Sequence, residues 1–339
     1  MELASLFALS GVFMGWSVGT NDAANVFGTA VGTRVVKFRT AAVFTAVFAT
    51  LGAVISGRNV IDKLGSYAEN NAVSSGMAAF LVMLVAAATV TLMTILKFPV
   101  STSQCLVGAV LGWGLSQGMA DWSKTSSFFS AWIVSPLATL VICFALCFAA
   151  ERFVEKRIKG LAAYDAFIKG GYIVSGIFGA FSMGANNAAN ATGIYLRAGI
   201  FDGPVQTING FLGAHNIPLT MTVPLLAALV GGLSIALGVL TYSKRVMLTV
   251  GEGITKLSPL TGFLVVLSCS VVVYIASLAG YTISTSQAVV GAVVGAGLAK
   301  GQPSVNLKML ARIFVAWFGT PTVAGVACYL IGIAFFKKM

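Results

Sequence analysis

Charge is what this sequence has least of. Only 9% of its 339 residues are Asp, Glu, Lys or Arg, whereas a soluble domain usually has about 25%. Acidic residues are the scarcer kind, with 10 Asp and Glu against 21 Lys and Arg, and there is 1 histidine. The mean hydropathy is +0.93. A chain this poor in charge has too few polar side chains to cover a water-facing surface, which excludes an ordinary soluble domain.

Motifs for ATP hydrolysis and for metal or redox chemistry are missing as well. The sequence has no Walker A motif, HExxH or CxxC. Its five cysteines lie in apolar stretches without metal-ligand or redox spacing, so we interpret them as buried free thiols. The net charge of +11 does not indicate nucleic acid, because the basic residues fall in gaps between apolar segments. We therefore expect no enzymatic activity, no resident cofactor and no nucleic-acid partner.

Long uncharged stretches take the place of these features. A helix needs about 20 apolar residues to cross the hydrocarbon core of a bilayer. Stretches of about that length are Thr40–Gly57, Gly76–Leu96, Ser126–Ala150, Ile217–Tyr242, Leu257–Gly280 and Ile313–Phe336. A shorter glycine-rich segment, 100–119, is either a further span or a re-entrant hairpin. The pattern predicts an all-α polytopic membrane protein.

The densest run of charge, Glu151–Lys169, lies near the middle of the chain. We interpret it as a linker, 151–170, between an N-terminal membrane repeat, 1–150, and a C-terminal membrane repeat, 171–339. Lys and Arg outnumber the acids in this run, and cytoplasmic loops carry such an excess. The linker is therefore predicted to be cytoplasmic.

Three motifs recur in the same order on both sides of the linker. The pairs are Gly19-Thr-Asn-Asp-Ala-Ala-Asn25 with Gly184-Ala-Asn-Asn-Ala-Ala-Asn190, Pro99-Val-Ser-Thr-Ser-Gln104 with Thr282-Ile-Ser-Thr-Ser-Gln287, and Trp132-Ile-Val-Ser-Pro136 with Trp317-Phe-Gly-Thr-Pro321. The offsets are 165, 183 and 185 residues, so the extra residues of the second half fall around 201–218. An odd number of crossings per half would invert the second repeat, and inverted repeats place a binding site at the bilayer midplane.

Asp22 is the only carboxylate with membrane-like sequence on both sides. An acid at that depth is costly unless it is paired, solvated or bound to a cation, and amide oxygens nearby suit a hard alkali cation. The predicted cation-binding residues are Asp22, Asn21, Asn25, Asn186, Asn187 and Asn190, with Asp22, Asn25 and Asn190 as the sodium ligands. The alternative is that Asp22 caps a broken helix.

The repeated Ser-Thr-Ser-Gln motif precedes an apolar helical run in each half, which is the pattern of a helix N-terminus. Such an end presents unpaired N–H groups and the positive end of the helix dipole, and it attracts anions. The predicted oxyanion-binding residues are Ser101, Thr102, Ser103, Gln104, Ser284, Thr285, Ser286 and Gln287. The alternative is ordinary capping with polar contacts between helices.

At these residues the chain resembles the inorganic phosphate transporter (PiT) family, whose signature is a duplicated Gly-Ala-Asn-Asp-Val-Ala-Asn-Ala. The copies here read Gly-Thr-Asn-Asp-Ala-Ala-Asn-Val (19–26) and Gly-Ala-Asn-Asn-Ala-Ala-Asn-Ala (184–191), and the resemblance covers essentially the whole chain. It implies import of inorganic phosphate driven by sodium or protons. It also implies ten to twelve spans in two inverted repeats with re-entrant or broken helices, and a homodimer in the cell membrane.

The chain departs from the PiT signature at Asn187, where the family usually carries Asp. The site therefore keeps one carboxylate instead of two. The number of cations carried with each anion is then undecided, and sulfate or another oxyanion is an alternative substrate. An anion channel or a membrane scaffold is an alternative of a different class. A channel does not need paired motifs that close a site from both sides, and a scaffold has no reason to keep Asp22 among duplicated polar groups.

Overall fold

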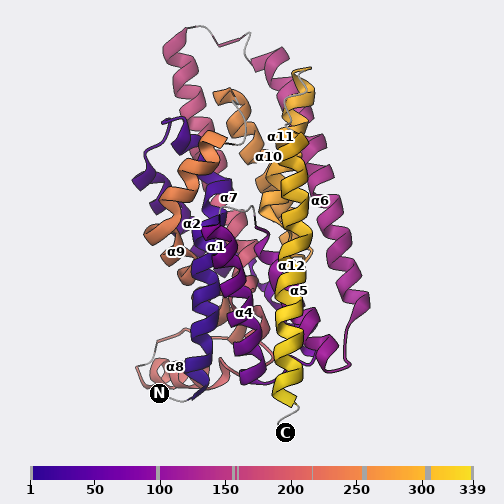
Figure 1. The fold of residues 1–339 in the computed structure, drawn as a ribbon. Coiled ribbons are helices and arrows are strands. Elements are labelled where there is room, and N and C mark those ends of the chain that lie inside the picture. The colour runs from indigo at the N-terminus through magenta and orange to yellow at the C-terminus, as the bar shows by residue number, and fades with distance from the viewer. Residues whose placement is uncertain are drawn as a thin grey trace.

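The computed structural model describes residues 3–96, 100–154, 157–158, 160–215, 217–253, 258–301 and 307–336, and every regular element within them is a helix. The α-helices are α1 (Leu3–Gly32), α2 (Phe38–Ser56), α3 (Arg58–Asn70), α4 (Gly76–Ile95), α5 (Thr102–Ser116), α6 (Trp122–Ala149), α7 (Leu161–Thr192), α8 (Asp202–Ala214), α9 (Val223–Gly253), α10 (Pro259–Leu278), α11 (Thr285–Ala299) and α12 (Leu307–Phe336). They form an elongated bundle with both termini at one end (Figure 1).

Five helix starts are fixed by side-chain caps. Ser75, Ser101, Asp121, Ser258 and Ser284 each accept a hydrogen bond from the backbone N–H three residues further on. A cap of this kind satisfies one of the unpaired donors at a helix start and stabilises it by about 1 kcal/mol. The two repeated Ser-Thr-Ser-Gln motifs therefore do begin helices, α5 and α11.

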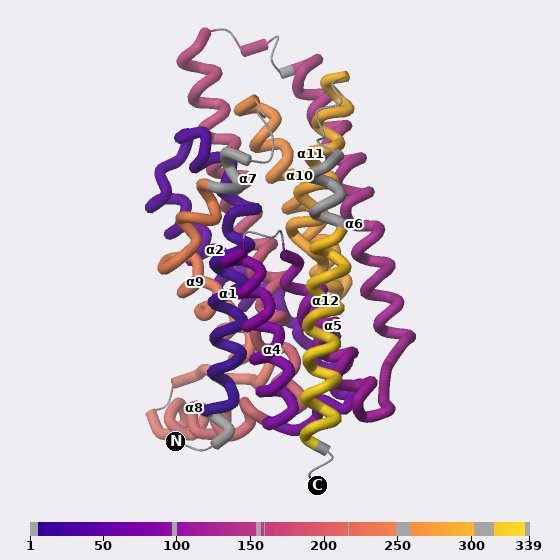
Figure 2. Tube along the Cα trace, viewed as in Figure 1, coloured from indigo at the N-terminus to yellow at the C-terminus, as the bar shows by residue number. Residues whose placement is uncertain are grey.

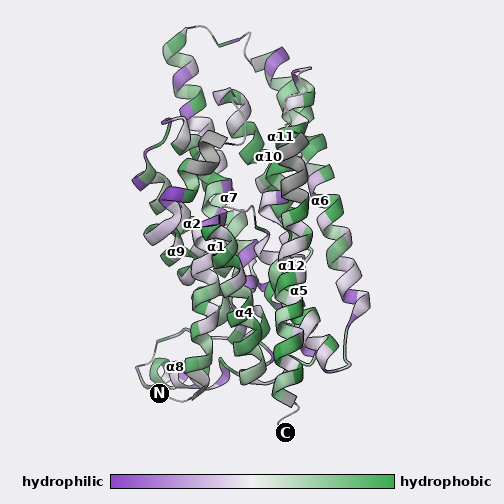
Figure 3. Ribbon diagram, viewed as in Figure 1, coloured by the Kyte–Doolittle hydropathy of each residue, from purple (hydrophilic) through white to green (hydrophobic). Residues whose placement is uncertain are grey.

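Seven of the described helical segments are long and apolar enough to cross a membrane. They are Phe38–Ser56, Gly76–Ile95, Trp122–Phe153, Leu161–Tyr195, Val223–Leu248, Pro259–Leu278 and Val315–Phe335. Hydrophobic residues run along most of the bundle, and hydrophilic ones gather mainly toward its two ends (Figure 3). The chain is a multi-pass, all-helical membrane protein, as predicted, although these helices do not confirm the count of ten to twelve spans.

Two short helices begin in the middle of the bundle. The helices α4 and α5 pack together in the lower half of Figure 2, and α10 and α11 pack together in the upper half. The starts of α5 and α11 meet between them, where Ser103 Oγ lies 2.7 Å from Thr282 Oγ1. The segment 100–119 is thus one arm of a helical pair, and its first residues, 100–104, are buried. Pro99 of the first motif lies outside the described residues.

The helices that carry the Asn-rich motifs are continuous. Asp22 lies inside α1 and Asn187 lies inside α7, each well away from a helix end. The interpretation of Asp22 as the cap of a broken helix is therefore wrong, because the interruptions fall at the Ser-Thr-Ser-Gln motifs instead. The predicted linker 151–170 is also largely helical, since a π-helical turn, Ala150–Val154, extends α6 and α7 already begins at Leu161.

Two equivalent glycines let the helices of the centre approach closely. A Cβ atom on Gly19 would lie 2.0 Å from the backbone oxygen of Ile235 in α9, and one on Gly184 would lie 1.9 Å from that of Ala49 in α2. Neither backbone can move without displacing a whole helix. The first Asn-rich motif is thus held against α9 and the second against α2.

We expect Gly184→Ala to destabilise the protein by about 1–3 kcal/mol, the usual cost of forcing extra atoms into a packed core. Gly170→Ala, on the same helix, is the matched control, because a Cβ atom there meets nothing within 4 Å. Thermal unfolding of the purified protein in detergent measures both variants. Equal midpoints for the two would contradict the packing described for Gly184.

Candidate functional site

Asp22 lies at the centre of a buried polar cluster formed by α1, α7 and the starts of α5 and α11. Its side chain is 2% exposed. Its Oδ2 accepts hydrogen bonds from Asn187 Nδ2 at 2.8 Å and from Thr102 Oγ1 at 3.2 Å, and the Thr285 side chain lies next to this carboxylate. The one carboxylate of the two signatures is thus in contact with the second signature and with both helix starts.

The orientation of the Asn187 amide is fixed by its neighbours. Its Oδ1 accepts hydrogen bonds from Asn186 Nδ2 at 2.8 Å and from Asn190 Nδ2 at 3.0 Å. Its Nδ2 is therefore the atom that faces Asp22. All three asparagine side chains are fully buried. Asn187 and Asp22 occupy equivalent positions in the two signatures. The position at which the two copies differ is therefore also the position at which they touch.

The starts of α5 and α11 are joined by a reciprocal pair of hydrogen bonds. Ser103 Oγ donates to the backbone oxygen of Ile283 at 3.2 Å, and Ser286 Oγ donates to that of Val100 at 3.1 Å. Both serines hold the same position in their motif, and each carbonyl lies three residues before the other serine of the pair. The two helix starts thus face each other with their hydroxyls and N–H groups toward one another.

Asn186 and Asn190 attach α7 to the segment just before α11. The Asn186 side chain donates from Nδ2 to the Ile283 oxygen at 3.0 Å and accepts from the Ile283 N–H at 2.9 Å. Asn190 donates from Nδ2 to Ser103 Oγ at 2.9 Å and accepts from Thr282 Oγ1 at 3.1 Å. The prediction did not include Thr282 and Ile283, although both lie inside the second Ser-Thr-Ser-Gln motif as quoted.

The two asparagines of the first signature lie differently. Asn25 Nδ2 donates to Thr285 Oγ1 at 3.0 Å, and both residues line a cavity of about 20 Å³ together with Ser182 and Ser270. That volume suits one water-sized species, and its hydroxyl and amide oxygens are ligands that an alkali cation accepts. Asn21 instead donates to Thr94 Oγ1 at 3.1 Å and does not join the cluster around Asp22.

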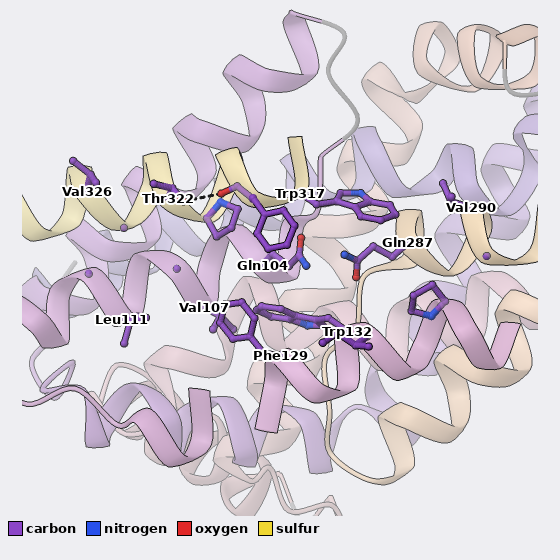
Figure 4. Close-up of a pocket in the computed structure, with 18 of the residues that line it drawn as sticks. Gln104, Val107, Leu111, Phe129, Trp132, Gln287, Val290, Trp317, Thr322 and Val326 are labelled. Atoms are coloured by element: carbon purple, nitrogen blue, oxygen red, sulfur yellow. Dashed lines mark hydrogen bonds between the residues drawn. The ribbon is translucent and has the colours of Figure 1, made fainter. Parts of the chain in front are cut away.

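The two glutamines of the predicted oxyanion site line a separate cavity. It has a volume of about 970 Å³, it is enclosed by α5, α6, α11 and α12, and its lining includes neither Asp22 nor the signature asparagines. Figure 4 shows the carboxamides of Gln104 and Gln287 near each other between Trp132 and Trp317. The structure therefore separates these glutamines from the other six predicted residues, which lie at the facing helix starts.

The site combines a buried carboxylate, oriented amides and two facing helix starts, and apolar helices long enough to cross a membrane surround it. This is the arrangement of a membrane protein that binds and moves small ions. The comparison with known families agrees with this class. The family model described as "Phosphate transporter family" matches residues 18–169 and 155–328. The chain belongs to this family, whose members are transporters and not enzymes.

Similar proteins extend over nearly the whole chain. A Pyrococcus horikoshii protein named "Putative phosphate permease" is 30% identical over an alignment of 393 positions, gaps included, which covers 96% of each chain. The Arabidopsis thaliana "Inorganic phosphate transporter 2-1, chloroplastic" is 26% identical and matches 92% of this chain and 68% of its own. A solved structure described as "The sodium-dependent phosphate transporter" covers 100% of both chains with a TM-score of 0.81 and 24% identity, so its fold is similar.

We expect Asn186→Ala to destabilise the protein more than Asn21→Ala, its equivalent in the first signature. Removing Asn186 leaves the buried Ile283 N–H without its partner, and such a loss costs about 1–3 kcal/mol. Asn21 is partly exposed and makes one side-chain hydrogen bond. Unfolding midpoints of both variants test the difference, and a larger effect of Asn21→Ala would contradict the role given to Asn186.

Proposed function

We propose that this protein imports inorganic phosphate by symport with a cation, most simply sodium. Membership of the phosphate transporter family supports the substrate, and the solved structure with a similar fold is that of a sodium-dependent phosphate transporter. The observation that carries the proposal is the contact between Asp22 and both helix starts through Thr102 and Thr285. It brings a cation-attracting carboxylate beside the donors that an oxyanion requires.

We propose that the two halves are inverted repeats. Each half contains three crossings and one helical pair. In the first half the crossings are α1, α2–α3 and α6 and the pair is α4 with α5. In the second half the crossings are α7, α9 and α12 and the pair is α10 with α11. Equivalent contacts are exchanged between the halves, because α5 packs on α12 where α11 packs on α6, and α1 packs on α9 where α7 packs on α2. Counting the four arms of the helical pairs gives ten membrane segments, the lower limit of the prediction.

The basic residues support an orientation for this arrangement. Arg34, Lys37 and Arg39 lie at the connection between α1 and α2, and Arg152 and Lys169 lie near the ends of α6 and α7. Both regions are at the end of the bundle opposite the two termini (Figure 1). Because cytoplasmic loops carry the excess of Lys and Arg, this end is the cytoplasmic one in a cell membrane, and it contains the predicted linker.

Phosphate would bind between the starts of α5 and α11. Hydroxyls of Thr102, Ser103, Thr285 and Ser286 and the N–H groups of the two first turns supply donors around one point. Of these groups, the Ser103 and Ser286 hydroxyls now donate to the backbone oxygens of Ile283 and Val100. An entering oxyanion accepts from them instead, which separates the tips of the helical pairs. Opening toward one side at a time gives alternating access to the site.

The cation would bind beside Asp22, with Asn25, Asn190 and the small cavity next to Thr285 as the neighbouring oxygen sources. The residue at position 187 determines how many cations or protons are needed to balance the negative charge of this centre. With Asp at 187, two carboxylate oxygens would lie about where Nδ2 and Oδ2 now stand, 2.8 Å apart, and like charges at that distance require a proton or a cation between them. The amide N–H takes that place here, so one cation suffices.

We further propose that the protein is a homodimer.

We expect Asp22→Asn to abolish gradient-driven phosphate uptake while the protein stays folded. The amide oxygen of the new side chain can still accept from Thr102 and Asn187, but the charge that attracts the cation is gone. Uptake of labelled phosphate into proteoliposomes, with and without a sodium or proton gradient, measures the effect. Asp62→Asn is the control, because Asp62 is partly exposed and pairs with Arg58.

The same assay separates the alternatives. Accumulation against the phosphate gradient excludes a channel, whereas no flux in the unmodified protein would contradict transport and leave a scaffold. Labelled sulfate run in parallel decides between the two oxyanions, and replacing the sodium gradient by a proton gradient decides the coupling ion. Coupled uptake by a well-folded Asp22→Asn variant would show that the cation binds elsewhere.

Asn187→Asp should make anion binding more dependent on sodium. Two unit charges 4 Å apart interact by about 4 kcal/mol at an effective dielectric constant of 20, so anion affinity at low sodium should fall by about tenfold or more and recover as sodium rises. Asn21→Asp adds the same charge outside the cluster and is the matched control. Phosphate and sulfate affinities are measured as functions of sodium concentration.

Superimposable curves for Asn187→Asp and the unmodified protein would show that position 187 is not near the bound ions. A phosphate transporter should stay active with the added acid and simply need more sodium. A sulfate transporter should lose activity outright, because protonation of the anion cannot relieve the repulsion.

A further inference from the structure

The cavity behind the two helix starts has the dimensions of a binding site. Its volume of about 970 Å³ lies at the upper end of the range of about 300–1,000 Å³ for small-molecule sites. Valine, leucine, tryptophan and phenylalanine side chains supply most of its lining, as Figure 4 shows for Val107, Leu111, Phe129 and Trp132. A ligand that fills it must be mostly apolar.

The rim of this cavity belongs to the lipid-facing side of the bundle. Ile133 and Leu137 on α6 are 64% and 57% exposed, and Phe318 and Val326 on α12 are 66% and 53% exposed, and all four line the cavity. Large aliphatic and aromatic side chains exposed on a membrane-spanning helix face hydrocarbon. The cavity is therefore reached from the lipid phase, and its occupant is a molecule that dissolves in a bilayer.

The inner end of the cavity is polar at two points. Gln104 and Gln287 are each 5% exposed, and the Oε1 atom of neither side chain has a hydrogen-bond partner among the described residues. A buried amide oxygen without a hydrogen-bond partner is unfavourable. Both glutamines sit at the same position of the repeated motif, and their carboxamides lie near each other in the cavity (Figure 4). The site thus offers a matched pair of unsatisfied amides.

We propose that this cavity binds a long-chain carboxylic acid in its protonated form. The acid O–H donates to a glutamine Oε1 and the acid carbonyl accepts from a carboxamide N–H, so one head group satisfies both kinds of amide atom. The neutral acid is the favoured form away from water, because burial disfavours the charged one. The alkyl chain packs along the apolar wall toward the lipid-facing rim.

The position of this site connects it to the centre of the bundle. Gln104 and Gln287 belong to the first turns of α5 and α11, directly after Ser103 and Ser286. A ligand held between the glutamines therefore contacts both helix starts from the side away from Asp22. The proposal does not depend on which anion or cation the protein carries, and its test can be read without transport.

The test uses quenching of tryptophan fluorescence by a dibrominated long-chain fatty acid added to the protein in vesicles. Trp132 and Trp317 line the cavity, so bound acid should quench them saturably. The methyl ester of the same acid has the same chain but lacks the O–H donor, and it should bind about tenfold more weakly. A Trp132→Phe, Trp317→Phe double variant should lose the saturable component and keep only the quenching of the remaining tryptophans.

The variant that tests the head group is Gln104→Leu with Gln287→Leu, which should abolish the preference for acid over ester. Gln117→Leu, a glutamine at the far end of α5 outside the cavity, is the matched control and should keep it. Val290→Phe fills the cavity and leaves both glutamines in the chain, and it should abolish saturable quenching by itself, which covers the case that the double glutamine variant does not fold.

Two outcomes would overturn the proposal. Acid and ester that quench the unmodified protein equally would show that the amides do not select a carboxylic head. Quenching that rises in proportion to the acid in the membrane, without saturation, would show that the cavity is not a site for this ligand, whether it is filled by ordinary lipid tails or by another protein surface.

Discussion

The hydrogen bond between Asn187 and Asp22 is the interaction on which the centre of this protein depends. A carboxylate buried to 2% exposure needs donors around it, and the structure supplies them from the second signature and from both helix starts. Asn186 and Asn190 orient the Asn187 amide, and the same two residues bond to Ile283 and Thr282 in the segment before α11. The same asparagines therefore position the start of α11 and orient the amide that donates to the buried carboxylate.

The repeated motifs predicted most of this arrangement from sequence. If the two halves are inverted repeats, as proposed, equivalent positions meet near the axis between them, and Asp22 with Asn187 is such a pair. The insertion inferred around 201–218 likewise coincides with a helix, α8. Asn21 could not be predicted to lie apart, because its side-chain direction depends on the neighbouring α4 and on its contact with Thr94.

Other features depended on three-dimensional packing that sequence patterns do not reveal. The Asn-rich motif looked like a place where a helix breaks, yet α1 and α7 pass through it, because their glycines fit against the backbones of α9 and α2. The glutamines of the second motif follow the serines directly, but one residue of helical rotation turns them toward α6 and α12. A motif quoted as one unit can thus serve two separate cavities.

The reciprocal serine bonds between α5 and α11 have a consequence for the direction of transport. Each tip is held by the backbone of the other, so withdrawing either one breaks the same two contacts. The tips are not held alike in other respects, because Asn186 and Asn190 also bond the segment before α11 to α7, whereas Asn21, the equivalent of Asn186, bonds to Thr94 instead. In a transporter of the proposed kind, the two openings would therefore differ in the contacts that each has to break.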